Sequence, residues 1–498
     1  MVPFGLAAEI ERMRRRDWIR NAVAAGLGAS AVRVLGAGGG ALLPLLDTAV
    51  TSAGPLRPPP DLVGPLVATP ATGVVWPGRS TSLLTLGGTY PSPTLRARRG
   101  DVFDLRLENR LSEATNIHWH GLAPPAEADG YPTDLVLPGS ARQYRFQIAE
   151  RAGTYWYHPH PDRRTGAQVY GGMAGFFIIE DDDERDLGLP AGEQDVPLLL
   201  QDRRRTTDRS FRYAPTPMDV MTGLLGDAVL VNGTPDAELS VAATAYRFRL
   251  LNGSNSRIFR VAFDDGRAFQ VIAGDGGLLE RPVASTALFL GPGERVEMLV
   301  DFSRDPIGGS PRLVSLPFST GEGGMGPGMG MGATSAQGAA FSLLRLAVQR
   351  RGPATAPTPA QLVPFPRLDP GRAEVRRRFV MDMRMPPFAG AFTINGRSFD
   401  AGRVDVRVER GVVEAWEVVN ASSEPHPFHV HATQFQVVSR SSGPLGAHER
   451  GPKDTVLVWP GETVQLAMRF EHHAGLYVLH CHNLEHEDAG MMLNLEVL

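Results

Sequence analysis

The stretch of the sequence best suited to chemistry lies near the C-terminus, where the only cysteine of the chain is surrounded by histidines. Cys481 stands between His480 and His482, and His486 and Met491 follow within ten residues. A thiolate with two imidazoles and a weak thioether is the ligand set that suits an electron-transfer copper ion. Because the cysteine is single, an internal disulfide is excluded.

Four His-x-His pairs occur in two distant parts of the sequence. They are His118/His120, His158/His160, His429/His431 and His480/His482. The segment 152–160, which contains the second pair, resembles 474–482, which contains the fourth, and the first pair likewise matches the third. The stretch between His160 and His426 contains no histidine. The first and last parts of the chain therefore have the same two pairs, and the middle part has none.

Strand geometry predicts how these pairs point. Alternate side chains of a strand share one face, so the two imidazoles of a pair point the same way, roughly 6.6 Å apart. If the first and last parts meet face to face, eight imidazoles converge on one pocket, which is too many for one metal and suits a small cluster. Cys481 then points to the opposite face, where it can join His426 and His486, with Met491 as a weak axial ligand. Proline occupies the equivalent position 159, so this second type of site is expected only once.

The elements that must position these residues are predicted to be short strands. Valine- and threonine-rich alternating stretches lie between turn residues, and the chain has 56 Gly and 41 Pro, which favours strands over helices. A similar sequence pattern occurs three times and ends at Asn109, Asn252 and Asn420. The intervals between these asparagines are as long as a domain. We expect an all-β chain of three tandem Greek-key β-sandwich domains, over residues 55–185, 186–350 and 351–498, the last beginning with a proline-rich linker.

The N-terminal region is expected to direct export. Arg15 and Arg16 precede Trp18 and a weakly apolar run that reaches residue 46, a pattern similar to a bacterial twin-arginine signal. A basic amphipathic helix is the alternative. We assign residues 1–54 to this signal region and expect a periplasmic or extracellular protein without stable membrane insertion. No basic stripe is present, and the net charge is -4, so we expect no nucleic-acid partner.

Taken together, these motifs resemble those of the multicopper oxidases. The match runs from about residue 60 to the end, and four motifs occur in the family's order. The resemblance implies three cupredoxin-like domains and four copper ions that couple one-electron oxidation of a donor to reduction of dioxygen to water. By the same resemblance, His426, Cys481, His486 and Met491 hold the type 1 copper, and His118 and His429 hold the type 2 copper. The type 3 pair is then held by His120, His158, His160, His431, His480 and His482.

Two carboxylates match acidic residues that assist proton supply in bacterial laccases. Asp129 lies eleven residues after His118, and Glu487 follows His486 directly. A proton relay must lie within hydrogen-bond reach of the reacting groups, directly or through one water. The alternative for each is a solvated loop carboxylate.

Other interpretations of the histidines remain open at this point. Isolated histidines are usually ordinary surface or core residues, and we assign that role to His448, His472 and His473. Zinc competes for any single His-x-His pair, whereas the lone cysteine with histidine and methionine favours copper. A non-catalytic copper-binding protein would not need the full ligand set, and neither would a copper nitrite reductase.

The donor is predicted less sharply than the metal. The glycine-rich segment 321–332 is expected to be a loop of the middle domain and contains Met325, Met329 and Met331. Thioethers are soft ligands that prefer cuprous ion, and similar insertions occur in the cuprous-oxidase branch of the family. The alternative is a linker with incidental methionines. A phenolic or aromatic compound and cuprous ion are therefore both candidate donors.

Overall fold

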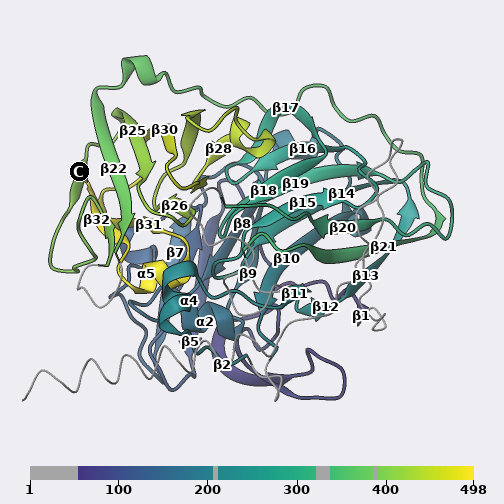
Figure 1. Cartoon of the computed structure of the whole chain (residues 1–498), viewed down its shortest axis with the longest axis horizontal. Helices are drawn as coiled ribbons and strands as arrows, with labels where there is room; N and C mark the ends of the chain where they lie inside the picture. Colours follow the sequence, from purple (N-terminus) through teal and green to yellow (C-terminus); the bar gives the residue numbers. More distant parts are fainter. Residues whose placement is uncertain (1–53, 206–210, 321–336, 385–390) are drawn as a thin grey trace, which may run out of the picture. The chain divides into compact units, whose positions relative to one another are not determined.

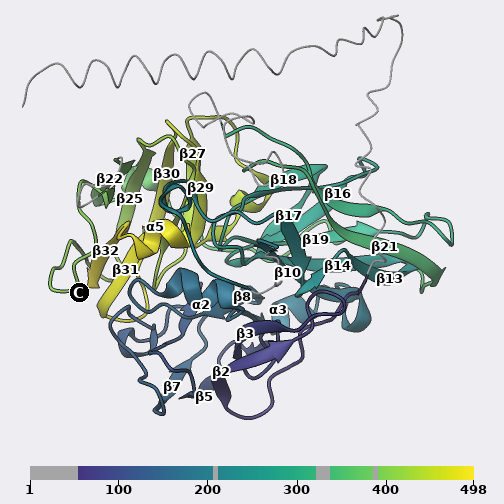
Figure 2. The same ribbon diagram turned by 60° about the horizontal axis from the view of Figure 1, so that its bottom comes forward.

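The fold consists of three pairs of packed β-sheets that follow one another along the chain (Figures 1 and 2). The computed structural model describes residues 54–205, 211–320, 337–384 and 391–498. Strands dominate these residues and helices are few and short, which confirms the predicted all-β class with three tandem β-sandwiches.

The first sandwich is built from two sheets between residues 66 and 180. One has the order β3 (Thr81–Leu86), β2 (Leu66–Gly73), β5 (Val102–Asn109) and β7 (Ala141–Gln147). The other has the order β4 (Leu95–Arg98), β9 (Gly175–Glu180), β8 (Gly153–His158) and β6 (His118–His120). Neighbours that are distant in sequence give the crossed connections of a Greek key.

The middle sandwich also takes in the first described strand of the chain. One sheet has the order β1 (Gly54–Pro55), β13 (Ala237–Ala243), β21 (Phe341–Arg351), β20 (Arg312–Ser315), β15 (Phe259–Phe263) and β18 (Ala287–Leu290). The other has the order β12 (Thr234–Pro235), β11 (Ala228–Val231), β10 (Asp195–Arg203), β14 (Ala245–Asn252), β19 (Arg295–Asp301), β16 (Phe269–Gly274) and β17 (Gly277–Ser285). Gly54 pairs with Ala237 in parallel, a long-range contact that the sequence pattern did not predict.

The third sandwich contains the C-terminal motif. One sheet has the order β23 (Phe392–Ile394), β22 (Val375–Met383), β25 (Val413–Asn420), β30 (Thr463–Arg469), β27 (Phe435–Arg440) and β28 (Pro452–Lys453). The other has the order β24 (Val406–Val408), β32 (Met492–Val497), β31 (Gly475–Cys481), β26 (His426–Val430) and β29 (Thr455–Val458).

Each sandwich is held by a core to which both of its sheets contribute. In β7 of the first sandwich, buried Tyr144 and Phe146 alternate with exposed neighbours, as expected of a strand with one face on a core. The third core joins Trp416 of β25 and Leu466 of β30 to Phe428 of β26 on the opposite sheet. The two sheets of each pair are therefore packed by their alternating apolar side chains.

The repeated asparagines have one structural role in all three sandwiches. Asn109, Asn252 and Asn420 are buried at the ends of β5, β14 and β25. Each accepts from the amide two residues ahead and donates from Nδ2 to one carbonyl of the loop that follows and to one more distant carbonyl. The distant acceptors are Val136, Leu290 of β18 and Val458 of β29. In the first and third sandwiches, the loop fixed in this way leads directly into the strand that begins with a histidine. The repeated asparagines therefore form the hydrogen bonds that fix where β6 and β26 begin.

Three short helices, one from each sandwich region, lie together near the C-terminal motif (Figure 1). They are α2 (Thr165–Gly171), α4 (Pro217–Thr222) and α5 (Leu484–Asp488), and α5 packs against both of the others. The remaining short elements are α3 (Asp182–Arg185) and the 3₁₀ turns η1 (Ala126–Ala128), η2 (Gly192–Gln194), η3 (Pro370–Arg372) and η4 (Ala447–Arg450). No helix in the described part of the chain is long and apolar enough to cross a membrane.

Two of the sequence predictions concern residues outside the described ranges. They are the twin-arginine pattern at Arg15 and Arg16 and the methionine-rich segment 321–332. The predicted linker between the second and third sandwiches is described, and it runs from the end of β21 to η3 without a strand or helix of its own.

Replacing Leu466 by alanine is expected to destabilise the third sandwich. Leu466 is fully buried in β30, and removing such a side chain costs about 2–5 kcal/mol because a cavity remains. A lower midpoint of thermal or denaturant unfolding is the measurement. The control is Val438→Ala on neighbouring β27, where the side chain is 39% exposed and the cost is about 0.5 kcal/mol or less. Equal midpoints for the two variants would contradict this account of the core.

Candidate metal centre

The four His-x-His pairs lie on, or directly after, two pairs of adjacent antiparallel strands, one in the first sandwich and one in the third. In the first sandwich, β6 and β8 are antiparallel, with His118 opposite His158. In the third, β26 and β31 are antiparallel, with His429 opposite His480. The same register thus brings two pairs side by side in each sandwich, as the sequence repeat indicates.

The imidazoles of the two sandwiches meet across a common seam. His118 Nε2 lies 3.4 Å from His429 Nε2, and His160 Nε2 lies 3.2 Å from His480 Nε2. The rings of His118 and His431 stack with centroids 3.7 Å apart. The first and third sandwiches therefore converge as the sequence predicted, and the histidine-free middle sandwich contributes no imidazole.

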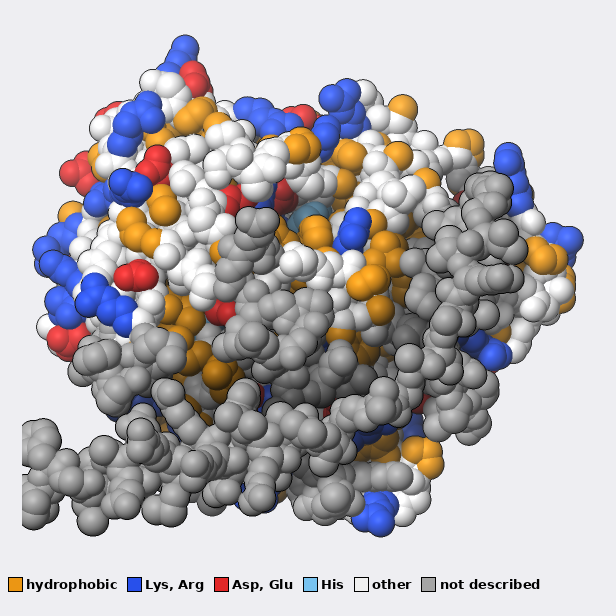
Figure 3. All heavy atoms as spheres, viewed as in Figure 1, with side chains coloured by type: hydrophobic (Ala, Val, Ile, Leu, Met, Phe, Trp, Pro, Cys, Tyr) orange, Lys and Arg blue, Asp and Glu red, His pale blue; other side chains and the backbone are white. Residues whose placement is uncertain are grey.

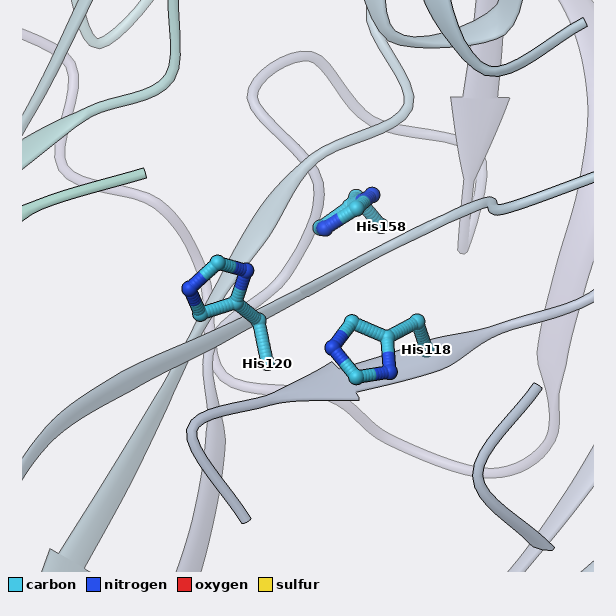
Figure 4. A group of neighbouring side chains, drawn as sticks. All are labelled: His118, His120 and His158. Carbon is cyan, nitrogen blue, oxygen red and sulfur yellow. The ribbon is translucent and has the colours of Figure 1, made fainter. Parts of the chain in front are cut away.

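Several groups of these residues are close enough to share a metal ion. In one group, His118 and His120 of β6 and His158 of β8 surround a common space (Figure 4), and their ligand atoms lie within 4.8 Å of one another. Two further groups join both sandwiches. They are His118 with His429 and His431, and His160 with His431 and His480.

Hydrogen bonds fix which nitrogen of each ring faces the seam. The Nδ1 atoms of His118, His158, His429 and His480 lie 2.8–3.1 Å from backbone carbonyls, and that of His431 lies 2.7 Å from Asp129 Oδ2. A carbonyl or carboxylate can only accept, so Nδ1 carries the proton and Nε2 is left with a lone pair. His120 is the reverse case, because its Nε2 lies 3.0 Å from Asp454 Oδ1.

The lone pairs fixed in this way face one another. His431 Nε2 lies 3.1 Å from His480 Nε2, and His118 Nε2 lies 3.4 Å from His429 Nε2. Neutral imidazoles in this arrangement repel unless a cation lies between them. The Nδ1 of His120, the Nε2 of His158 and both ring nitrogens of His482 are buried without a hydrogen-bond partner among the described residues. This donor set fits bound metal ions, for which a neutral imidazole nitrogen is a common ligand.

Burial keeps these imidazoles neutral. Desolvation, together with the neighbouring histidines, lowers the pKa of His120, His158, His429 and His431 well below the usual value. Desolvation also lowers the pKa of His482 to about 3 and that of His160 to about 4. Few histidine side chains are visible on the molecular face in Figure 3, in keeping with their burial.

A second group lies within the third sandwich, on the other face of β31. Cys481 Sγ lies 3.3 Å from His426 Nδ1 and 3.7 Å from His486 Nδ1. The two Nδ1 atoms lie 3.1 Å apart, while their Nε2 atoms contact Ser422 Oγ at 2.7 Å and the Met221 carbonyl at 3.1 Å. Cys481 therefore points into the sandwich core while His480 points to the seam, as the strand alternation predicts.

The sulfur of this group is sealed from solvent. Cys481 and Met491 are fully buried in the same core, and the Cys481 amide donates to the Met491 carbonyl at 3.0 Å. Burial raises the pKa of the Cys481 thiol, so that a bound metal ion is needed to hold it as a thiolate. Cysteine with two histidines in a buried site favours copper over zinc, which usually keeps four protein ligands or an open water position.

Comparison with known proteins agrees with this geometry. Family models described as multicopper oxidase match residues 70–184, 201–308 and 372–498. Bilirubin oxidase of Albifimbria verrucaria is 34% identical over 85% of this chain and 74% of its own length.

The chain belongs to the multicopper oxidase family. The crystal structure of the McoA multicopper oxidase of Aquifex aeolicus has a TM-score of 0.82 and 35% identity, and the match covers 90% of this chain and 100% of that one. A multicopper oxidase of Campylobacter jejuni described as a metallo-oxidase has a TM-score of 0.78 and 30% identity over 90% of this chain and 96% of that one. The protein is therefore a copper-dependent oxidoreductase that uses oxygen.

Both predicted carboxylates of the oxidase lie at the histidine seam. Asp129 is fully buried, and its carbonyl accepts from His118 while its side chain accepts from His431. Glu487 is 3% exposed, with Oε2 3.2 Å from His480 Nδ1 and Oε1 3.5 Å from His160 Nε2. Burial raises the pKa of Glu487, but the adjacent His160 and His480 outweigh it and hold the pKa well below the usual range. The solvated-loop alternative is wrong for both residues.

The other three histidines stand apart from the seam. His448 is buried in η4 beside Glu294, whereas His472 and His473 are exposed. None of the three belongs to a metal-binding group of the described residues.

No sequence pattern pointed to the residues that hold α5 in place. Glu485 accepts hydrogen bonds from Tyr213, Leu224, Asn255 and Ser256 of the middle region. Asp488 accepts from the amides of Thr165 and Gly166 at the start of α2. These carboxylates fix the helix that contains His486. They stand beside the motif in the sequence, but their partners are distant and carry no spacing pattern.

Replacing Asp129 by alanine is expected to weaken copper binding by the oxidase. The Asp129 carboxylate fixes the tautomer and orientation of His431, and losing such a partner lowers metal affinity about 10–100-fold. A copper titration of the apoprotein is the measurement. The control is Glu127→Ala, because Glu127 lies in the same turn, is exposed and has no histidine hydrogen bond through its side chain. If both variants bound copper as tightly as the original chain, Asp129 would have no part in holding the site.

Proposed function

We propose that this oxidase binds four copper ions at the two groups of residues and reduces dioxygen with electrons taken from an external donor. In this assignment, the type 1 copper would be held by His426, Cys481 and His486, with Met491 as a weaker fourth ligand. His118 and His429 bind the type 2 copper. The type 3 pair is bound by His120, His158, His160, His431, His480 and His482.

The observation that carries this proposal is the set of opposed imidazole lone pairs at the seam. His118 faces His429 and His431 faces His480 through nitrogens that cannot donate to each other, since each ring has its proton on the other nitrogen. One metal ion could not use eight imidazoles, whereas a three-ion cluster can. The family match supplies the identity of the metal.

Copper held by these residues would supply the redox chemistry, in which single electrons are taken from the donor and four are delivered to dioxygen. The chain itself provides the connection between the two groups, because Cys481 is joined through the backbone to His480 and His482. A path of covalent bonds therefore leads from the sulfur in the sandwich core to the imidazoles at the seam.

The two seam carboxylates are proposed to help supply the protons that oxygen reduction consumes. Glu487 Oε2 is within hydrogen-bond distance of His480 Nδ1. Because the pKa of this carboxyl lies below its usual range, the ionised carboxylate would accept a proton and pass it on beside the seam rather than store it. Asp129 binds His431 and the Asp129 backbone binds His118, which makes its role partly one of orientation.

Electrons are proposed to enter at His486. The His486 Nε2 donates to the Met221 carbonyl of α4, and Met218 on the same helix is 50% exposed. The contact places a surface helix directly against a type 1 ligand. A phenolic or aromatic donor can dock against this surface, and bilirubin oxidase, a relative, is named for an organic donor.

Cuprous ion is the second candidate donor. The exposed thioether of Met218 on α4 favours it, since thioethers are soft ligands that prefer Cu(I). Met325, Met329 and Met331 would add to the same preference. A relative described as a metallo-oxidase is consistent with this alternative, in which the enzyme protects its compartment from copper.

The place of action is proposed from the N-terminal sequence. The twin-arginine pattern at Arg15 and Arg16 would send the protein to the periplasm or the cell exterior. That route carries folded proteins, which suits an enzyme that needs its metal ions in place.

Replacing Cys481 by serine tests the type 1 assignment. The substitution removes the thiolate, so we expect the blue absorption and the turnover of the donor to be lost while copper bound by the seam histidines remains. Visible absorption and a copper-to-protein ratio measure the two effects. Ser422→Ala is the matched control, because it alters a hydrogen bond to His426 and leaves the sulfur in place. A serine variant that stayed blue would refute the assignment.

Deleting residues 321–332 separates the two donors. If the methionines supply cuprous ion, its oxidation falls sharply while phenol oxidation persists or rises, with oxygen consumption as the measurement. The control is a variant that keeps Met325, Met329 and Met331 and removes only glycines from the same segment. Unchanged cuprous oxidation after the full deletion would leave the segment without a role in donor choice.

A further inference from the structure

His120 differs from the other seam histidines in how its ring is held. A side chain rather than a backbone carbonyl contacts the ring, and the contact is at Nε2 rather than Nδ1. Its Nε2 lies 3.0 Å from both Asp454 Oδ1 and Thr455 Oγ1, and its Nδ1 is buried without a partner among the described residues. A backbone carbonyl can only accept a hydrogen bond, whatever the residue. The side chain of residue 454 is different, because a substitution there could place a hydrogen-bond donor beside His120 Nε2. The ring nitrogen that His120 offers to the seam thus depends on having an acceptor at position 454 and on where that acceptor lies.

Asp454 also holds a second histidine. Its backbone carbonyl lies 2.8 Å from His429 Nδ1, while its side chain holds His120. The two rings stack with centroids 3.8 Å apart and planes at 11°. Asp454 belongs to the third sandwich and His120 to the first, so one residue sets two imidazoles on opposite sides of the seam.

The Asp454 carboxylate is fixed by an arginine from the middle sandwich. Arg295 Nη1 lies 2.8 Å from Asp454 Oδ1, and Arg295 Nη2 donates to Asp454 Oδ2. Both side chains are fully buried. This two-pronged contact fits the planar geometry of guanidinium and carboxylate, which a lysine ammonium does not reproduce.

Arg295 uses its remaining donors to join all three sandwiches. Nε donates to the Thr154 carbonyl of β8, Nη1 to that of Gly293, and Nη2 to that of Asp275. With the two bonds to Asp454, all five N–H groups of the guanidinium have an acceptor. The middle sandwich has no imidazole at the seam, but this residue ties it to a strand that contains ligands in the first sandwich and to Asp454 in the third.

The surroundings leave no room for another arrangement. A Cβ atom at Gly121 would lie 2.6 Å from Asp454 Oδ2 and 2.7 Å from Arg295 Nη2, and Gly121 has a φ of +92°. The Asp275 side chain accepts from the Arg295 amide and lies 2.8 Å from Lys453 Nζ, while Lys453 lies 3.1 Å from Glu294. The pair is therefore embedded in a buried set of alternating charges, in which each charged group has an opposite neighbour.

We propose that Arg295 and Asp454 are positioning residues that make His120 present Nδ1 to the cluster, so that the histidine-free middle sandwich controls copper binding at the seam. The carboxylate accepts a hydrogen bond from His120 Nε2, and Arg295 binds both carboxylate oxygens, so the oxygen beside His120 stays oriented to accept. The inference rests on the proposed copper assignment of the seam. It adds to that assignment a role for a domain without ligands.

Asp454→Asn tests this proposal in the copper-loaded full chain. The new amide can donate to His120 Nε2, which favours the tautomer with its proton on Nδ1 and removes the lone pair from the seam. We expect the copper affinity of the seam to fall about 10–100-fold. The near-ultraviolet absorption of the coupled copper pair should be lost, while the blue absorption of the Cys481 site persists. Retention of both bands with unchanged copper affinity would overturn the proposal.

Asp195→Asn is the matched control. Asp195 also receives two bonds from a buried arginine, Arg249 in the middle sandwich, here through Nε and Nη2 rather than the two Nη atoms, and no histidine of the described residues forms a hydrogen bond with it. We expect this variant to keep both absorption bands. If it lost the near-ultraviolet band as Asp454→Asn does, the effect would be one of general stability, and the proposal would fail.

Thr455→Val provides a second variant that adds no charge and little change of shape. It removes one of the two contacts of His120 Nε2 and one bond to Asp454 Oδ1. We expect a smaller loss of seam copper in the same direction, with the blue band unchanged, so the proposal stays testable if Asp454→Asn does not fold. No loss in the threonine variant would contradict it.

The original chain separates this inference from the proposed function. If the unaltered, copper-loaded protein showed neither band, the copper assignment itself would be wrong. If the unaltered protein showed both bands and the variants showed them unchanged, the copper assignment would stand and the role of Arg295 and Asp454 would be refuted.

Discussion

The whole arrangement depends on keeping a set of imidazoles neutral inside a dry seam. Burial and mutual proximity lower the pKa of most of them, so that at ordinary pH they offer lone pairs rather than charges. Lone pairs that face one another repel unless a cation lies between them. The same desolvation that would make this seam costly in an empty protein makes it a strong binding site for metal ions. The protein fold and the metal ions therefore stabilise each other.

Strand alternation solves the problem of serving two metal sites from one strand. Along β31, His480 faces the seam and Cys481 faces the core of the third sandwich. A single backbone connects the two sites. The equivalent strand of the first sandwich, β8, is followed by a proline at position 159, so it contributes to the seam alone. Two sandwiches with the same His-x-His pairs thus form one shared cluster, and the third sandwich alone adds a separate site.

The parts that sequence predicts well are those encoded by local spacing. The paired His-x-His motifs, the three asparagines and the alternation in β7 each depend on residues a few positions apart, and the fold class and the meeting of the imidazoles follow from them. Glu485, Arg295 and Asp454 depend instead on partners hundreds of residues away, across sandwich boundaries. Nothing in the nearby sequence distinguishes a residue that positions a histidine or a helix from an ordinary member of a buried ion pair. The pairing of Gly54 with Ala237 is hidden for the same reason.

The burial of Lys453 has a practical consequence for anyone who attaches this enzyme to a surface. It is the sole lysine of the sequence, and it is fully buried between Asp275 and Glu294. Reagents that couple to primary amines therefore find no side-chain amine on the folded exterior and are left with the terminal amino group. Random multi-point coupling through amines is excluded, so electrodes or resins modified in this way would hold every molecule by one end of the chain.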